Sequence, residues 1–195
     1  MFKSNNRFFF TLFIAVEIAI AAISILVYGI GLDALQTTTR LSGRLSLLVF
    51  SLIFLSQTSP FKKHWLPDRP YLIFAIVHGI HLCELALFVT LSDRALVPIR
   101  VLGGAVAYLF IFVMPFAEQF RKSLKITDSF FARLELGFQA YIWLIFLLTY
   151  IPRVMGTLAD SGGTYWQHVN LLVWVIGMPL IRIAAYLKLT PARNN

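Results

Sequence analysis

Charged residues are scarce in this chain. Asp, Glu, Lys and Arg make up only 13% of its 195 residues, whereas a soluble domain carries roughly a quarter. Hydrophobic residues make up 58%, and the mean hydropathy is +0.77. The few charges are gathered in short clusters between long apolar runs. This balance excludes an ordinary soluble domain and predicts an integral membrane protein.

Several features that would indicate other classes of protein are also missing. Cysteine occurs once, at Cys83, which excludes an internal disulfide and a cysteine-rich metal site. There is no internal repeat and no glycine-rich nucleotide-binding loop. The net charge of +8 comes from dispersed basic residues, which indicate anchors to anionic lipid rather than a nucleic-acid-binding surface.

Six apolar segments are present, each close to the roughly 20 residues that cross about 30 Å of hydrocarbon. They cover residues 8–31, 41–59, 71–91, 96–117, 135–152 and 165–187. The first follows Lys3 and Arg7 but is longer than a signal-peptide core, so we expect it to be a retained helix. Lipid offers no partners to open backbone groups, so all six should be α-helices. The sequence predicts a single domain over 1–195, an all-α bundle of six transmembrane helices.

Lysine and arginine are unevenly divided between the two sets of connections. With a cytoplasmic N-terminus, 12 of the 17 basic residues lie in cytoplasmic parts and 5 lie on the opposite side. The positive-inside rule then predicts that both termini are cytoplasmic, in a multi-pass protein of the plasma or bacterial inner membrane. The longest connection, 118–134, has apolar residues along one face and basic residues mainly opposite. That pattern predicts a helix lying at the cytoplasmic interface.

The third segment carries ionisable residues inside an apolar run, AIVHGIHLCEL at residues 75–85. His78 and His81 are three residues apart and share a helix face, which Glu84 continues. At 1.5 Å per residue from Tyr71, His78 lies about 10 Å deep and His81 about 15 Å, near the midplane. Ionisable groups in a membrane are costly and indicate a functional site, and neutral imidazole binds haem iron and other transition metals. The alternative is hydrogen bonding between packed helices.

Other polar residues are weaker candidates. Glu17 lies near the middle of the first segment and either carries protons, pairs with a histidine, or is a protonated carboxyl bonded to a neighbouring helix. His168 begins the sixth segment, roughly 10 Å from His81 along the membrane normal, which argues against their pairing on one haem. The remaining polar candidates are His64, in a solvated loop, Gln57 and Gln139.

Four stretches of the chain resemble bacterial ferric reductase-like transmembrane proteins, in their small six-helix branch. The resemblance covers about residues 37–153 and includes TTTRLSGRLSLLVFSLIFLSQTSP, AIVHGIHLCELALF, GGAVAYLFIFVMPF and RLELGFQAYIWLIFLLTYIPR. Members usually have a histidine pair such as His78 and His81 and a fifth helix that ends before Pro-Arg. The family also includes, more distantly, the haem-binding subunit of a methionine sulfoxide reductase system. The resemblance implies a membrane-embedded b-type haem that moves electrons.

The chain departs from that family at the start of the fifth segment. Relatives tend to have histidine after Arg-Leu, whereas this chain has Glu135, and no histidine occurs between residues 82 and 167. The ligand that usually faces the third helix is therefore missing. In one interpretation, a single histidine holds the haem, and the second ligand is either another group or absent. In the other, this protein has lost the cofactor.

On the haem hypothesis, His78, His81 or both bind the iron. The other histidine would hydrogen-bond beside the ligand, or Glu84 would orient the ligand, as carboxylates commonly do for metal-bound imidazoles. Arg40 and Arg44, in RLSGR, either meet haem propionates near the outer side or anchor the second helix beside lipid headgroups.

Three functional classes remain open. The first is an electron-transfer component of a membrane oxidoreductase. The flavin and NAD(P)H domains of larger relatives are absent, so its electrons would come from a redox partner protein, a quinone or a free flavin. The second is a haem-free structural or accessory subunit, which Glu135 favours. The third is a proton-handling transporter that uses Glu17, His81 and Glu84. In all three classes the protein is embedded in the lipid bilayer, and we expect no nucleic-acid partner.

Overall fold

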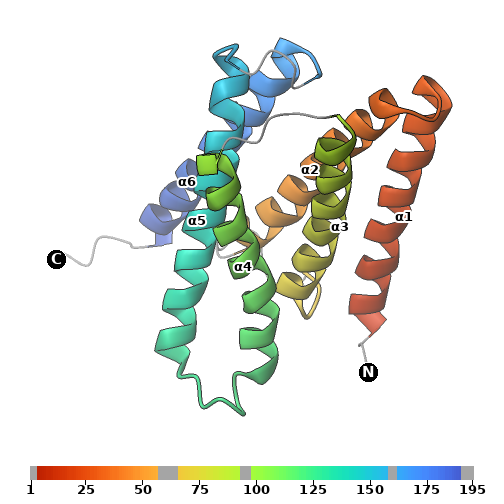
Figure 1. Cartoon of the computed structure of the whole chain (residues 1–195). Coiled ribbons are helices and arrows are strands. Elements are labelled where there is room, and N and C mark those ends of the chain that lie inside the picture. Colours follow the sequence, from red (N-terminus) through yellow and green to blue (C-terminus); the bar gives the residue numbers. More distant parts are fainter. Residues whose placement is uncertain (1–3, 57–65, 93–97, 158–161, 190–195) are drawn as a thin grey trace.

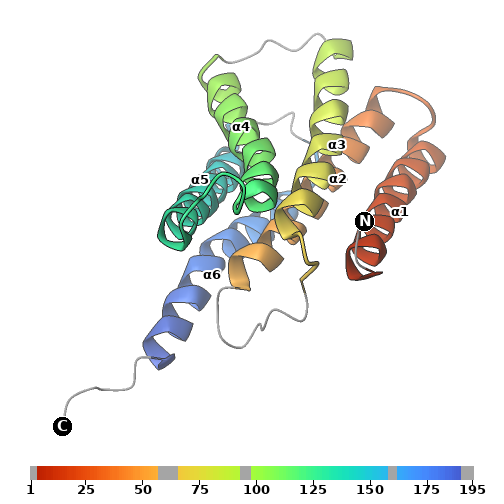
Figure 2. The same cartoon turned by 90° about the horizontal axis from the view of Figure 1, so that it is seen from below.

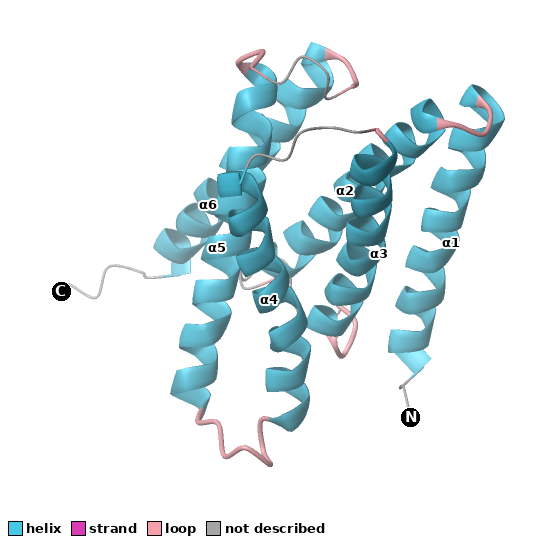
Figure 3. Cartoon of the chain, in the orientation of Figure 1, coloured by secondary structure: helices cyan, strands magenta, loops and turns pink. Residues whose placement is uncertain are grey.

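The computed structural model describes residues 4–56, 66–92, 98–157 and 162–189, and this part of the chain contains helices and no strands (Figures 1 and 3). The helices are α1 (Ser4–Tyr28), α2 (Leu32–Leu55), α3 (Pro70–Leu91), α4 (Pro98–Phe120), α5 (Asp128–Val154) and α6 (Tyr165–Leu189). All six are long and apolar enough to cross a membrane. The predicted all-helical class with six spanning-length helices is therefore confirmed.

Local chemistry sets several of the helix ends. α1 ends before Gly29, whose φ of +74° is readily adopted only without a side chain. α3 begins at Pro70, whose fixed φ and missing N–H suit the first helical position. α5 is capped by Thr127, whose Oγ1 accepts a hydrogen bond from the Phe130 amide at 3.3 Å.

The predicted starts of three helices are wrong. α1 begins at Ser4 rather than at residue 8, and α5 begins at Asp128 rather than at residue 135. α2 begins at Leu32 rather than at residue 41, because the polar stretch before residue 41 is packed between neighbouring helices instead of forming a loop. The interfacial helix predicted for 118–134 does not form. α4 continues to Phe120, and α5 starts at Asp128. Between them the chain reverses at Lys125, which has a φ of +52°, and Arg121 forms an ion pair with Asp128 across the turn.

α2 is the central helix of the bundle. Of its most apolar stretch 67% is buried, against 17–28% in the other five helices. It packs against α1, α3 and α6, while α5 packs against α4 and α6. In the view of Figure 2, α1 lies at one edge of the bundle and α4 and α5 lie at the opposite edge.

Small polar residues let the neighbouring helices approach α2 closely. Thr38 and Thr39 return their hydroxyl groups to backbone carbonyls one turn earlier, Ala34 O at 2.9 Å and Leu35 O at 2.8 Å. This local bonding satisfies the hydroxyls within α2. The polar segment that precedes the predicted helix can therefore be buried at little cost.

The core and the outer surface are both apolar. Phe50, Phe74 and Phe138 are fully buried and pack against one another at tilted and edge-to-face angles. Many large apolar side chains nevertheless point outward, among them Leu26 (83% exposed) and Leu109 (64%). A water-soluble protein rarely exposes so much contiguous apolar surface. This surface is compatible with six helices that are long and apolar enough to cross a membrane.

Candidate functional site

His78 faces the side of α3 that meets α4 and α5. Its ring centroid lies 5.1 Å from that of Tyr108 on α4, 6.2 Å from that of Phe146 on α5 and 5.3 Å from that of Phe74 on α3. The Nδ1 atom of His78 is buried and has no hydrogen-bond partner. An imidazole in an aromatic enclosure with an unsatisfied nitrogen is costly, so this position is a candidate ligand-binding site.

His81 faces α2. A Cβ atom added at Gly43 would lie 3.0 Å from His81 Cε1 and 3.4 Å from Nε2, so glycine at this position lets the imidazole lie against the α2 backbone. The His81 ring also contacts the Thr39 backbone, and its Nδ1 is buried without a partner. Its ring centroid is 5.4 Å from that of His78.

The two histidines are thus neighbours with different surroundings. His78 and His81 project from the same helix one turn apart. In the described part of the chain no group of three or more His, Cys, Asp or Glu side chains is placed to hold a metal ion. His78 is the histidine that faces the α4–α5 side.

Glu84 lies near a second carboxyl group. Ser42 Oγ on α2 donates a hydrogen bond to Glu17 Oε1 on α1 at 3.0 Å, and Glu84 on α3 contacts the same hydroxyl. Both glutamates keep one buried oxygen, Oε2, without a partner. The structure therefore brings together two of the three residues named in the proton-handling hypothesis, Glu17 and Glu84, through Ser42. Sequence analysis missed Ser42, which looked like one of several serines in an apolar helix.

Arg40 and Arg44 lie within α2 and point toward α6. Arg44 Nη2 donates to Gln167 Oε1 at 2.9 Å, and Arg40 Nη2 donates to Thr37 Oγ1 at 3.4 Å. Arg40 Nε is buried without a partner. Because α2 starts earlier than predicted, Arg40 is a helical residue, as Arg44 already was in the predicted segment 41–59.

The same end of the bundle gathers further basic groups. His168 Nε2 lies 3.0 Å from the Gly162 carbonyl oxygen, within electrostatic range of Arg40, Arg44 and Arg153. Arg153 Nη1 donates to the Thr149 carbonyl at 2.6 Å. This basic cluster (Arg40, Arg44, Arg153 and His168) comes from α2, α5 and α6. Sequence analysis missed the contribution of Arg153, which stands far from the others in the chain.

Glu135 does not face the histidine pair, contrary to the sequence-based expectation. It accepts a hydrogen bond from the Tyr71 hydroxyl near the start of α3. On α5 the residue beside His78 is Phe146, and eleven residues at 1.5 Å each place Glu135 about 16 Å away along the helix. The identity of residue 135 therefore does not decide which group stands opposite His78.

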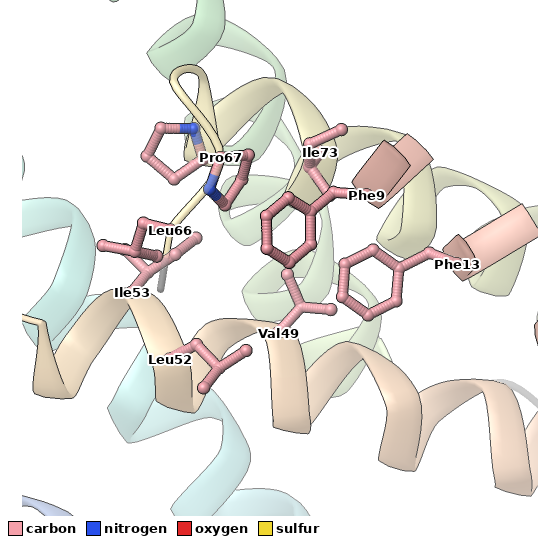
Figure 4. A pocket seen from close by; sticks show the side chains of 9 residues that line it. Phe9, Phe13, Val49, Leu52, Ile53, Leu66, Pro67 and Ile73 are labelled. Carbon is pink, nitrogen blue, oxygen red and sulfur yellow. The ribbon is translucent and has the colours of Figure 1, made fainter. Parts of the chain in front are cut away.

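The other polar candidates lie elsewhere. Gln139 is 1% exposed and accepts a hydrogen bond from Arg182 Nη1 at 2.5 Å, so it is a packing residue between α5 and α6. His64 and Gln57 lie outside the described residues. Figure 4 shows a small hollow between α1, α2 and α3, lined by apolar side chains such as Phe13, Val49 and Ile73. It offers no donor or acceptor side chain to a polar ligand.

Comparisons with protein-family models, with curated proteins and with solved structures find no match for this chain. The resemblance to ferric reductase-like proteins thus rests on the sequence motifs alone.

Proposed function

We propose that this chain is a multi-pass protein of the plasma or bacterial inner membrane that carries electrons through a b-type haem held by His78. The observation that carries the proposal is the buried, unpartnered Nδ1 of an imidazole in the middle of a spanning-length helix. Buried ionisable groups at this depth mark functional sites. When bound, the haem would supply the one-electron chemistry.

The residues around His78 have roles that follow from their positions. Phe74, Tyr108 and Phe146 surround the imidazole and would exclude water from it. His81, packed on Gly43, would keep the α2 side of α3 in place rather than bind the iron.

The basic cluster would bind the acidic substituents of the same group. Guanidinium groups pair well with carboxylates, and Arg40 and Arg44 project from successive turns of one helix face. The buried, unpartnered Nε of Arg40 supports a role in binding an anion over a role beside lipid headgroups. Electrons would be exchanged with a redox partner protein, a quinone or a free flavin.

The proposed orientation has both termini in the cytoplasm. Basic residues favour it, because 12 of 17 then lie on the cytoplasmic side. An even number of spanning helices also returns the chain to the side on which it began. A cysteine-accessibility or reporter-fusion test at each terminus would check this orientation, and labelling of either terminus from outside intact cells would contradict it.

A haem-free accessory subunit is the second candidate. The specific observation in its favour is the aromatic packing of His78, since ring centroid separations of 5.1–5.3 Å to Tyr108 and Phe74 are ordinary contact distances in a core. In that case the six helices would serve as a scaffold for a partner subunit.

An absorption spectrum separates the two candidates. Protein purified from haem-replete cells should show a stoichiometric Soret band that shifts on reduction with dithionite. His78→Ala should lose this band and His81→Ala should retain it, because only His78 faces α4 and α5. Equal retention in both variants would refute the ligand assignment. A colourless but folded wild-type protein would refute haem binding and favour the accessory role.

A further inference from the structure

Three helices bring polar groups to one level in the middle of the bundle. At 1.5 Å per residue, Glu17 lies about 20 Å along α1 from Ser4, and Glu84 lies about 21 Å along α3 from Pro70. Both helices start at the same end of the bundle (Figure 1). Ser42 of α2 lies between the two carboxyl groups, in contact with both.

This site is enclosed on its α1 and α2 sides, while Glu84 on α3 is half-buried. Ser42 is fully buried, and Glu17 is 4% exposed with its Oε2 atom unpartnered. Ser46, one turn further along α2 and on the same face as Ser42, is also fully buried and its Oγ has no partner. An isolated carboxylate in such surroundings is strongly disfavoured.

Hydrogen-bond donors can be counted at this site. A serine hydroxyl has one proton to donate, and an ionised carboxylate has none. Ser42 donates its proton to Glu17, so its hydroxyl has no second proton with which to bind an ionised Glu84 beside it. Two ionised carboxylates would leave Glu84 beside a lone pair of Ser42 and a second negative charge.

The charged and titratable groups nearby do not remove this constraint. α1 contributes Glu17 itself, and α3 contributes His81 one turn before Glu84. The arginines of α2 are directed elsewhere, since Arg44 reaches Gln167 on α6 and Arg40 reaches Thr37. No Lys or Arg is seen paired with either glutamate among the described residues.

We propose that Glu17 and Glu84 form a proton-binding site inside the membrane, in which the pair holds at least one proton at neutral pH and Ser42 links the two carboxyl groups. The site is separate from the one assigned to His78 and does not depend on a haem. Groups of this kind serve as proton relays in membrane proteins, and His81 is the nearest further proton acceptor on α3.

Infrared spectroscopy of the protein in lipid vesicles tests the proposal. A protonated carboxyl group gives a C=O band that an ionised carboxylate lacks and that shifts in deuterated water. The difference between the wild type and the Glu17→Gln/Glu84→Gln double variant should contain the intensity of at least one carboxyl per chain. Glutamine keeps the shape of the side chain and can still donate to Ser42. An unchanged band in the folded double variant would overturn the proposal.

Two further measurements sharpen the test. Asp128→Asn is the matched control, because Asp128 is 98% exposed beside Arg121, and it should leave the band unchanged. If the double variant does not fold, the Glu17→Gln and Glu84→Gln single variants should each shift the band or reduce its intensity, because the remaining carboxyl group loses its partner. An unchanged band in both single variants would count against the proposal. A band that appears only after sodium is removed would also overturn it, because the pair would then hold the metal cation.

Discussion

Replacing Gly43 by alanine tests how closely α2 and α3 pack at His81. The added Cβ would lie 3.0 Å from His81 Cε1 and 3.5 Å from Nδ1, so the imidazole must move by a few tenths of an ångström. The ring centroid of His81 lies 5.4 Å from that of His78, and the His81 ring contacts the Thr39 backbone. These two contacts leave the ring little freedom. The added methyl group should therefore overpack the contact between α2 and α3.

Two opposing effects set the change in the free energy of unfolding that Gly43→Ala should cause. Alanine is favoured over glycine in a helix interior by about 1 kcal/mol. Overpacking a well-packed core costs about 1–3 kcal/mol. The Gly43→Ala variant should therefore be destabilised by about 0–2 kcal/mol in the free energy of unfolding. When His81 is also replaced by alanine, the clash is removed and the same substitution should stabilise by about 1 kcal/mol.

A double-mutant cycle in detergent micelles, with unfolding by SDS, measures both effects. Gly104→Ala is the matched control, because a Cβ added at Gly104, inside α4, meets no atom within 4 Å. This control should be stabilising whether or not His81 is present. The coupling energy between Gly43→Ala and His81→Ala should be about 1–3 kcal/mol. An equal effect of Gly43→Ala in both backgrounds would refute the inferred packing.

Two other contacts can be tested by the same unfolding assay. Tyr71→Phe should lower the free energy of unfolding by about 1–3 kcal/mol, because it leaves the partly buried carboxyl group of Glu135 without the Tyr71 donor. This loss should be smaller in a Glu135→Gln background, and additive effects of the two substitutions would contradict the hydrogen bond. Arg182→Lys should cost about 1–3 kcal/mol, because lysine loses both the fork that reaches Gln139 and the flat contact over Phe54. The exposed Arg133→Lys substitution should be neutral, and equal effects at both arginines would contradict this role.

Hydropathy was sufficient to find the six helices, because length and apolar composition are local properties. It placed the start of α2 nine residues too late, because Gln36, Thr37, Thr38 and Thr39 lower the local hydropathy although two of the threonines are buried. Their hydroxyls bond back to the helix itself, which an apolar scale does not take into account. The turn at Lys125 was missed for a related reason, since its flanking residues have the pattern of an amphipathic helix.

The candidate site was predictable in its residues but not in its arrangement. The spacing of His78, His81 and Glu84 along one helix required only the helical repeat. Which helix each side chain meets depends on how α3 packs. That packing is set by residues on other helices, namely Gly43, Ser42, Tyr108 and Phe146. The expected position of Glu135 was wrong because the order of motifs along the chain does not determine which residue of α5 lies at the height of His78 on α3.

The arrangement of α3 separates the two kinds of chemistry that its polar residues can carry. His78 points toward α4 and α5, and Glu84 points toward α1 and α2. His81 lies between them, held against α2 by Gly43. A substitution that removes the carboxyl pair should therefore leave the surroundings of His78 intact, since the aromatic side chains around His78 come from α3, α4 and α5, whereas the carboxyl groups come from α1 and α3. Loss of the infrared carboxyl band without loss of a Soret band would show that they are independent, whereas joint loss in a folded protein would mean that His81 couples them.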